Sequence, residues 1–355
     1  MLYSLQDVTL IPASVSEITS RKECNPYDKY NRLPLFTAPM SQIVNETNWQ
    51  EFSKHVHTII PRNVDIDTRL RLSVETFVAL SLDEFIDCFC SPQLRLLDTH
   101  YILVDVANGH MAKLIEACSL AKLMWGDQLI LMAGNVANPI TYLEYAEAGI
   151  DYIRLSIGSG SQCTTANTGI YYPMASLIRE TYKMRNTVEG TKKQYRSVPK
   201  IVADGGFNTY GDIIKALALG ADYVMCGKIF AQTVEACGKI KCFQYPGGYD
   251  SLACGIFDEW IRHQNIAYIT EAECFREYYG MSTKRAQKEF GKEGNKTEEG
   301  IASKIPVCYF LESWINEFTD YLRSAMSYTN HKNVSGFIGG VHYEYLSPTS
   351  IRTFK

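Results

Sequence analysis

The sequence lacks the features that mark several large classes of protein. Basic residues are not in excess, since 35 lysines and arginines face 39 aspartates and glutamates and the net charge is −4; this balance argues against a nucleic-acid-binding surface. No segment has the length and apolarity of a membrane span. The first residues also lack the charged region and long apolar stretch of a signal peptide. We therefore expect a cytoplasmic protein that binds neither nucleic acid nor membrane.

Two common ligand signatures are missing as well. The cysteine pairs Cys88/Cys90 and Cys237/Cys242 have neither a second pair nor the histidines of a zinc site. No Gly-x-Gly-x-x-Gly fingerprint follows a predicted strand, so a dinucleotide would not be held by a Rossmann fold. The eleven cysteines are scattered and odd in number, which favours reduced thiols over a disulfide framework.

What the chain does contain is an alternation of short apolar runs and amphipathic stretches. Residues 111–124, 139–148, 210–219 and 309–329 have the apolar spacing of helices, whereas residues 1–34 read as mostly irregular. The apolar runs predict eight strands, at residues 35–38, 58–60, 77–80, 101–105, 129–133, 152–155, 200–203 and 223–225. Eight such units predict an α/β fold, a (β/α)₈ TIM barrel, whose active site lies on the loops that follow the strands.

One of these loops, residues 156–165, contains a candidate nucleophile. Its sequence is Ser-Ile-Gly-Ser-Gly-Ser-Gln-Cys-Thr-Thr. Gly158, Ser159 and Gly160 permit a tight turn whose backbone amides face a ligand. Cys163 at the end of this turn, next to hydroxyl-bearing residues, is placed where a thiolate can be stabilised. The alternative is a buried, inert cysteine, which is the commoner state of a free thiol.

The loop resembles the cysteine loop of the inosine monophosphate (IMP) dehydrogenase and guanosine monophosphate (GMP) reductase family, Gly-Ile-Gly-Pro-Gly-Ser-x-Cys-x-Thr. Ser156 replaces the first glycine of that motif, and Ser159 replaces its proline. Further motifs of the family match in the same order over nearly the whole chain, at residues 7–12, 37–40, 105–109, 133–136, 203–206, 280–282, 299–300 and 322–324.

The resemblance implies roles for individual residues. Cys163 would attack carbon 2 of a purine nucleotide to form a covalent thioimidate, while Thr165 and Glu299 would handle the proton of the group that leaves or attacks. Asp204 would accept the ribose hydroxyls, although this motif could also be a tight turn in which Asp204 caps the next helix. The other substrate-binding residues implied are Ser161, Gly205, Gly206, Gly227, Lys228, Tyr278, Gly280, Met281, Ser282 and Gly300.

The resemblance also implies a nicotinamide cofactor, NADPH or NADP. Its nicotinamide end would lie near Asp105, Ala107, Asn108 and Gly109. Some members of the family bind potassium, which would here contact the carbonyl groups of Gly158, Gly160 and Cys163. Family members are usually homotetramers, and we carry that expectation over.

Two enzymes share this scaffold, and the sequence favours the reductase, which deaminates GMP to IMP and ammonia. The dehydrogenase hydrolyses its intermediate with an Arg-Tyr pair from a mobile flap. Here the corresponding residues, 284–300, contain Arg285 but no tyrosine. Ala166 argues the other way, because reductases commonly have a basic residue there. Two alternatives therefore stay open: an IMP dehydrogenase, or a paralogue that binds a purine nucleotide without turning it over, as the departures at Ser156, Ser159 and Lys228 suggest.

The same comparison predicts the domain organisation. Most dehydrogenases of the family insert a pair of regulatory CBS modules between the second and third strands, where this chain has only residues 61–76. Residues 237–275 are longer than the matching stretch of the family, and no function is apparent for them. We expect residues 1–355 to form a single catalytic barrel, with an insertion at about 237–275 and a flap at about 284–300.

Overall fold

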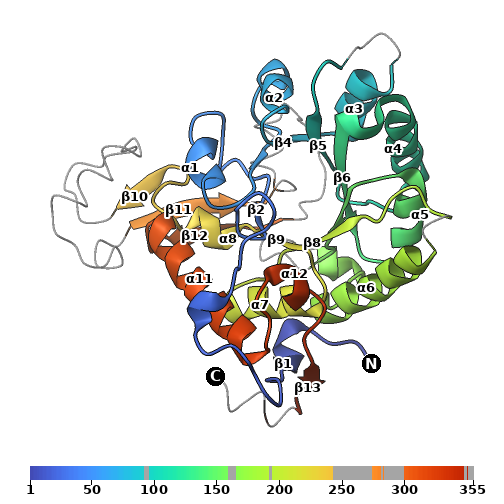
Figure 1. The fold of residues 1–355 in the computed structure, drawn as a ribbon. Helices are drawn as coiled ribbons and strands as arrows, with labels where there is room; N and C mark the ends of the chain where they lie inside the picture. Colours follow the sequence, from blue (N-terminus) through green and yellow to red (C-terminus); the bar gives the residue numbers. More distant parts are fainter. Residues whose placement is uncertain are drawn as a thin grey trace.

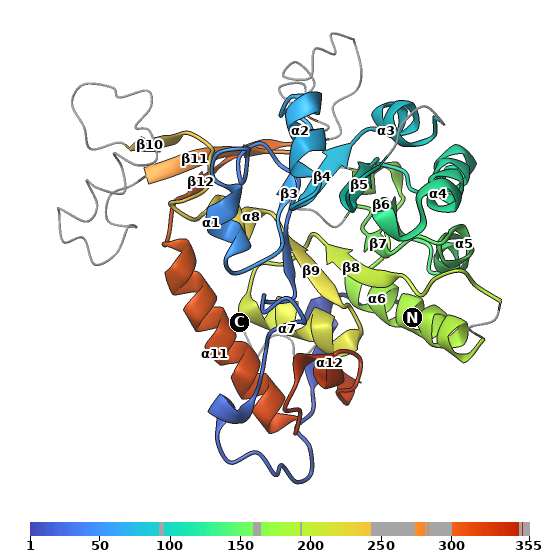
Figure 2. The ribbon, with the colours of Figure 1, turned by 45° about the horizontal axis from the view of Figure 1, so that its top comes forward.

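The centre of the molecule is a ring of eight parallel strands (Figures 1 and 2). The computed structural model describes residues 1–91, 96–158, 165–191, 194–242, 274–280, 283, 300–347 and 350. The strands of the ring are β2 (Leu35–Thr37), β3 (Ile59–Ile60), β4 (Phe77–Leu80), β5 (His100–Asp105), β6 (Leu129–Val136), β7 (Tyr152–Leu155), β8 (Lys200–Asp204) and β9 (Tyr223–Cys226). All eight predicted strands are confirmed, with ends that differ by at most three residues.

Backbone hydrogen bonds close the ring between its first two strands. The sheet runs in the order β2-β9-β8-β7-β6-β5-β4-β3, and a parallel bridge joins Phe36 of β2 to His57, just before β3. The His57 amide donates to the Leu35 carbonyl at 2.9 Å, and the His57 carbonyl accepts from Thr37 at 2.9 Å. The fold is therefore a (β/α)₈ barrel, as the eight apolar runs predicted.

Helices cover the outside of the ring (Figures 1 and 2). They are α1 (Trp49–Ser53), α2 (Ile66–Leu72), α3 (Leu82–Phe89), α4 (Ala112–Trp125), α5 (Thr141–Ala148), α6 (Met174–Gly190), α7 (Tyr210–Leu219), α8 (Lys228–Ala231), α11 (Leu311–Tyr328) and α12 (Val334–Phe337). Short 3₁₀ turns occur at Leu5–Asp7, Arg21–Glu23, Gly126–Gln128 and Thr165–Thr168. The four helices expected from apolar spacing are confirmed. Only α2 and short turns separate β3 from β4, which leaves no space for a regulatory insertion there.

The amino-terminal segment contains a strand that the sequence did not predict. β1 (Val8–Leu10) pairs antiparallel with β13 (Tyr343–Tyr345), at the bottom of Figure 1. The pair lies outside α6 and α7, where Tyr3 contacts Ser176 and Leu5 contacts Lys215. Aromatic rings of Phe36, Phe77, Tyr152 and Tyr223 fill the end of the barrel at which the strands begin, in edge-to-face contacts.

A second sheet, also unpredicted, lies beside α11. It consists of the antiparallel strands β10 (Ile240–Cys242), β11 (Cys274–Tyr279) and β12 (Ala302–Pro306). The fully buried Arg276 of β11 donates to the carbonyls of Thr233 and Ala236 at 2.9 and 2.8 Å, and also to those of Ala231 and Gly238. The sheet is thereby fastened to the chain that follows α8.

The predicted insertion and flap lie largely outside the described residues. Of residues 237–275, only the two ends belong to described structure, and of the flap only Gly300 does. Cys274 is disulfide-bonded, so the expectation of reduced thiols is wrong at that residue. Among the helices that the structure describes, none is long and apolar enough to cross a membrane.

Candidate active site

A cavity of about 370 Å³ opens at the ends of the strands, where the βα loops gather. Nearly every strand of the ring contributes to its wall. Its lining is Ala38, Pro39, Met40, Arg62, Asp105, Val106, Ala107, Asn135, Arg154, Ser156, Ile157, Gly158, Thr165, Asp204–Asn208, Met225–Lys228, Tyr278 and Gly280. This is the end of a (β/α)₈ barrel at which active sites form.

The structure brings many of the predicted site residues together in this one cavity. Those that line it are Asp105, Ala107, Gly158, Thr165, Asp204, Gly205, Gly206, Gly227, Lys228, Tyr278 and Gly280. Asn108, Gly109 and Gly300 are described but do not line it. The remaining ones, Gly160, Ser161, Cys163, Met281, Ser282 and Glu299, lie outside the described residues.

A buried ion cluster joins the two carboxylates of the cavity. Arg154, within β7, lies between Asp204 at the end of β8 and Asp105 at the end of β5. Its Nη1 is 2.5 Å from Asp105 Oδ1, while its Nε and Nη2 are 2.9 and 2.8 Å from Asp204 Oδ2. All three side chains are at most 13% exposed. The sequence did not single out Arg154, because it sits inside an otherwise apolar run.

Burial and charge act against each other in this cluster. Burial alone would lower the pKa of Arg154, but Asp204 and Asp105 raise it above its ordinary value. Burial raises the pKa of Asp204, an effect that Arg154 opposes and that the negative charge of Asp105 adds to. Two carboxylates sharing one guanidinium keep a net negative charge, which suits them to accept hydrogen bonds from hydroxyl groups.

Gly134 makes room for the arginine beside β6. A Cβ atom added to Gly134 would lie 2.7 Å from Arg154 Cβ and would also clash with the Arg154 carbonyl. The β6–β7 register shifts at this point, between Ala133 and Val136. Any larger residue at position 134 would therefore displace the central member of the cluster.

The end of β8 turns on two consecutive glycines. Gly205 and Gly206 have φ angles of 85° and 87°, which L-residues with side chains rarely adopt. Asp204 does not cap the following helix: Thr209 is the N-cap of α7, and its side chain accepts from the Asp212 amide. The capping alternative for Asp204 is thus wrong, and its carboxylate faces Arg154.

Tyr278 of β11 packs against the end of β9. Its hydroxyl donates to Met40 Sδ at 3.3 Å and lies so close to Gly227 that a Cβ there would collide with it. A thioether is a weak acceptor. A stronger acceptor on a bound ligand could therefore take over this hydrogen bond. Lys228, next to Gly227, places a cationic side chain on the same part of the wall.

On the opposite part of the wall, Asn135 presents an unused acceptor. Its Oδ1 is buried and has no partner among the described residues, and Asn135 lines the cavity near Asp105 and Ala107. Gly109 lies behind this wall: its amide donates to the Asn135 carbonyl at 2.7 Å, and its carbonyl accepts from Tyr145. Gly109 therefore supports the loop that carries Asn135.

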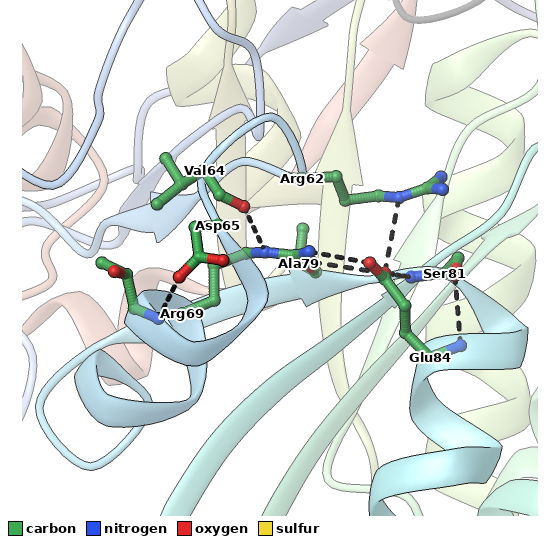
Figure 3. Close-up of polar contacts among 8 residues, drawn as sticks. Arg62, Val64, Asp65, Arg69, Ala79, Ser81 and Glu84 are labelled. Carbon is green, nitrogen blue, oxygen red and sulfur yellow. Dashed lines mark hydrogen bonds and ion pairs between the residues drawn. The ribbon is translucent and has the colours of Figure 1, made fainter. Parts of the chain in front are cut away.

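A second arginine of the wall, Arg62, belongs to a charge network behind the cavity (Figure 3). Its Nε lies 4.0 Å from Oε2 of Glu84, at the start of α3. The buried Arg69 holds the same carboxylate with two contacts, of 2.7 and 3.2 Å. Figure 3 shows the two guanidinium groups approaching Glu84 from different sides. Burial raises the pKa of Glu84, but Arg69 and the Ser81 amide outweigh it and lower the pKa to about 2.

The described charges of the cavity wall sum to a positive value. Arg62, Arg154 and Lys228 are cationic, and Asp105 and Asp204 are anionic. Arg154 is shared by the two carboxylates, and Arg62 also faces Glu84 behind the wall, so Lys228 supplies the remaining positive charge of the described lining. The cavity therefore favours an anionic ligand that also carries hydroxyl groups.

Comparison with known proteins agrees with this geometry. The family model described as "IMP dehydrogenase / GMP reductase domain" matches residues 90–249. A protein named GMP reductase from Streptococcus pyogenes serotype M5 (strain Manfredo) is 27% identical, over 94% of this chain and 92% of its own length. A GMP reductase from serotype M49 (strain NZ131) is 26% identical over the same shares. The chain is similar to proteins of the IMP dehydrogenase/GMP reductase family over most of its length.

The structure also describes part of the loop in which this chain departs from the family motif. Ser156 is buried and lines the cavity. Gly158 has a φ of 74° and packs against Ala166, whose Cβ would lie 3.4 Å from a Cβ at position 158. The small Ala166 side chain therefore fits closely beside the entry to the loop. Nothing in the described structure explains Ser159, which lies outside it.

Proposed function

We propose that this chain is an NADPH-dependent GMP reductase, which deaminates GMP to IMP and ammonia through a covalent thioimidate on Cys163. The observation that carries the proposal is the cavity itself. It combines a carboxylate that can accept from hydroxyl groups, Asp204, with the double-glycine turn of Gly205 and Gly206 and a cationic wall. The relatives compared above are named GMP reductase.

The nucleotide would bind along the ends of β8 and β9. Asp204 would accept the ribose hydroxyls, and the glycine amides after it would approach the phosphate. Tyr278 would exchange its weak contact with Met40 for a phosphate oxygen, and Lys228 would add positive charge. Ser161, Gly227, Gly280, Met281, Ser282 and Gly300 are the remaining residues that we assign to this nucleotide.

The cavity wall near β5 and β6 has groups that fit the nicotinamide end of a cofactor. The buried Oδ1 of Asn135 is an acceptor without a partner among the described residues, so it suits a carboxamide NH₂. Asp105 and Ala107 lie beside it, and Asn108 and Gly109 follow in the same loop. When bound, NADPH supplies the hydride that replaces the amino group at carbon 2.

The chain's own groups would divide the remaining chemistry. The Cys163 thiolate would form a bond to carbon 2, and ammonia would leave as the carbon–nitrogen bond breaks. Thr165 and Glu299 would deliver the proton to the departing amino group. Once a hydride has been added at carbon 2, the carbon–sulfur bond breaks, which releases IMP and restores the thiolate.

A substrate panel tests this proposal. The protein should consume NADPH in the presence of GMP and release ammonia and IMP in equal amounts. With IMP and NAD it should form little xanthosine monophosphate at steady state, because no Arg-Tyr pair is present to activate water. Sustained xanthosine monophosphate production, faster than GMP deamination, would instead identify a dehydrogenase. Binding of GMP without turnover would identify the non-catalytic paralogue.

Other properties of the family remain proposals for this chain. These are a homotetramer, a cytoplasmic location, a single domain over residues 1–355, and potassium at the carbonyls of Gly158, Gly160 and Cys163. Among the described residues, no group of three or more histidine, cysteine or acidic side chains could hold a metal ion. A potassium site would therefore depend on backbone carbonyls of the cysteine loop.

A further inference from the structure

Arg154 lies between two carboxylates that the proposed function gives to two different ligands. Asp204 is assigned to the ribose of the nucleotide, and Asp105 to the nicotinamide end of the cofactor. The arginine contacts both at once, at 2.8–2.9 Å and 2.5 Å. Since β5 and β8 lie on either side of β6 and β7 in the ring, Arg154 connects two parts of the cavity wall that have no strand contact.

The guanidinium group is rigid, so its two contacts depend on each other. It is planar, and its donors form a fixed fork. Nε and Nη2 point to Asp204, and Nη1 points to Asp105. A rotation that improves the geometry at one carboxylate changes it at the other. The Arg154 side chain is only 8% exposed, and Gly134 packs against its Cβ. It therefore cannot easily adjust its contact with one carboxylate while keeping its contact with the other unchanged.

We propose that Arg154 is a positioning residue that couples nucleotide binding to cofactor binding. Ribose hydroxyls bound to Asp204 fix the orientation of that carboxylate. The fixed carboxylate orients Arg154, and Arg154 then holds Asp105 in place for the cofactor. The ligand that binds first therefore loses most of the free energy needed to fix these three side chains. The second ligand then binds more tightly than it would to the empty protein. The coupling is reciprocal. This inference rests on the proposed function, because it needs both ligands to occupy the one cavity.

The coupling is measured in Cys163→Ala, with GMP and NADP⁺ as the two ligands. In this variant no thioimidate can form, and neither ligand has a hydride to donate, so the pair cannot react. Isothermal titration gives the Kd of NADP⁺ with and without saturating GMP. We expect GMP to lower that Kd by about fivefold or more, the usual scale of coupling between two sites. A ratio of one or less, with both ligands bound, overturns the inference.

Arg154→Lys tests whether the arginine carries the coupling. Lysine keeps the positive charge, but its single ammonium group cannot form the same fork. The ratio of the Kd for NADP⁺ without GMP to the Kd with GMP should fall to within about twofold of one, even though each ligand still binds. Arg185→Lys is the matched control. Arg185 forms an equivalent ion pair with the buried Asp222 at 2.7 Å, at the opposite end of the barrel, and its substitution should leave the ratio unchanged. An unchanged ratio in Arg154→Lys overturns the inference.

A second measurement does not depend on the folding of Arg154→Lys. Asp105→Asn lets Arg154 turn wholly toward Asp204, so the affinity for GMP alone should fall by about threefold or more. This effect crosses from the cofactor side to the nucleotide side. An unchanged GMP affinity in Asp105→Asn overturns the coupling. By contrast, failure of the wild-type protein to bind either GMP or NADP⁺ at all would refute the proposed function.

Discussion

Asp151 and Asp222 make two matching contacts each, just before β7 and β9 begin, and Asp222 Oδ1 also pairs with Lys200 at 3.1 Å. Asp151 Oδ2 accepts from the Leu131 amide at 2.8 Å and pairs with Lys122 at 2.9 Å. Asp222 Oδ2 accepts from the Ile201 amide at 2.8 Å and pairs with Arg185 at 2.7 Å. Each aspartate follows a helix-ending glycine by two residues and precedes a strand that begins with tyrosine. Each aspartate therefore links the start of its own strand to the preceding strand and to the helix before that strand.

The two aspartates should differ in their contribution to stability because they differ in exposure. The Asp222 side chain is 6% exposed, whereas that of Asp151 is 28% exposed. Asp222→Asn breaks a buried ion pair and should lower the free energy of unfolding by about 3 kcal/mol. Asp151→Asn should cost about 1 kcal/mol, closer to a surface pair. Urea denaturation of both variants measures this difference, and equal losses would contradict it.

Glu84 should make stability depend on pH in the acid range. Its pKa is lowered to about 2 by Arg69 and the Ser81 amide against the opposing effect of burial. A lowered pKa stabilises the folded state above the unfolded-state value near 4.5, and this contribution disappears as pH falls toward 2. At pH 7, Glu84→Gln should be less stable than the wild type by about 2 kcal/mol.

The same variant provides its own pH control, since glutamine does not titrate. The difference in denaturation midpoint between wild type and Glu84→Gln should shrink steadily between pH 4.5 and pH 2. A difference that stays constant over this range would show that the ionised carboxylate is not what stabilises the network in Figure 3.

The nucleophile assignment predicts a separation of binding from turnover. Cys163→Ala should abolish GMP reduction while leaving the Kd for GMP within about tenfold of the wild-type value, because the thiolate acts mainly in the transition state. Steady-state NADPH consumption and equilibrium titration with GMP measure the two effects. Cys118→Ala, which alters a fully buried cysteine of α4 that does not line the cavity, is the matched comparison, since it should retain turnover. Residual wild-type activity in Cys163→Ala would exclude the covalent mechanism.

The ribose assignment can be tested on the ligand, without changing the protein. Asp204 should accept hydrogen bonds from both ribose hydroxyls, so 2′,3′-dideoxy-GMP should bind more weakly than GMP by about 2 kcal/mol or more. Competition titrations compare the two nucleotides directly. Equal affinities would mean that Asp204 only forms its ion pair with Arg154 and does not bind the ribose.

Local pattern predicted the barrel well, because its strands are buried on both faces and so read as apolar runs. The glycine and carboxylate motifs at the strand ends were also visible, and the cavity collects most of those that the structure describes. Arg154 was missed because its partners Asp105 and Asp204 lie 49 and 50 residues away in the sequence. The pairing of β1 with β13 and the sheet formed by β10, β11 and β12 were missed for the same reason, since no local signal encodes a distant partner.

The Gly-x-Asp-Tyr repeat is a sequence pattern from which some long-range contacts could have been predicted. Residues 149–152 and 220–223 share this sequence pattern, and each copy forms the aspartate contacts described above. An internal comparison of the βα units would have found it.

The register of β10 and β11 would allow the connection between them to be redesigned. Cys242 and Cys274 are register partners in the antiparallel pair, so β10 ends beside the residue at which β11 begins. Opposed residues of such a pair are about 5 Å apart, a gap that a two-residue turn can span. A short turn that joins β10 directly to β11 should therefore preserve the register of this pair, and every connection of the eight-stranded ring would stay unchanged.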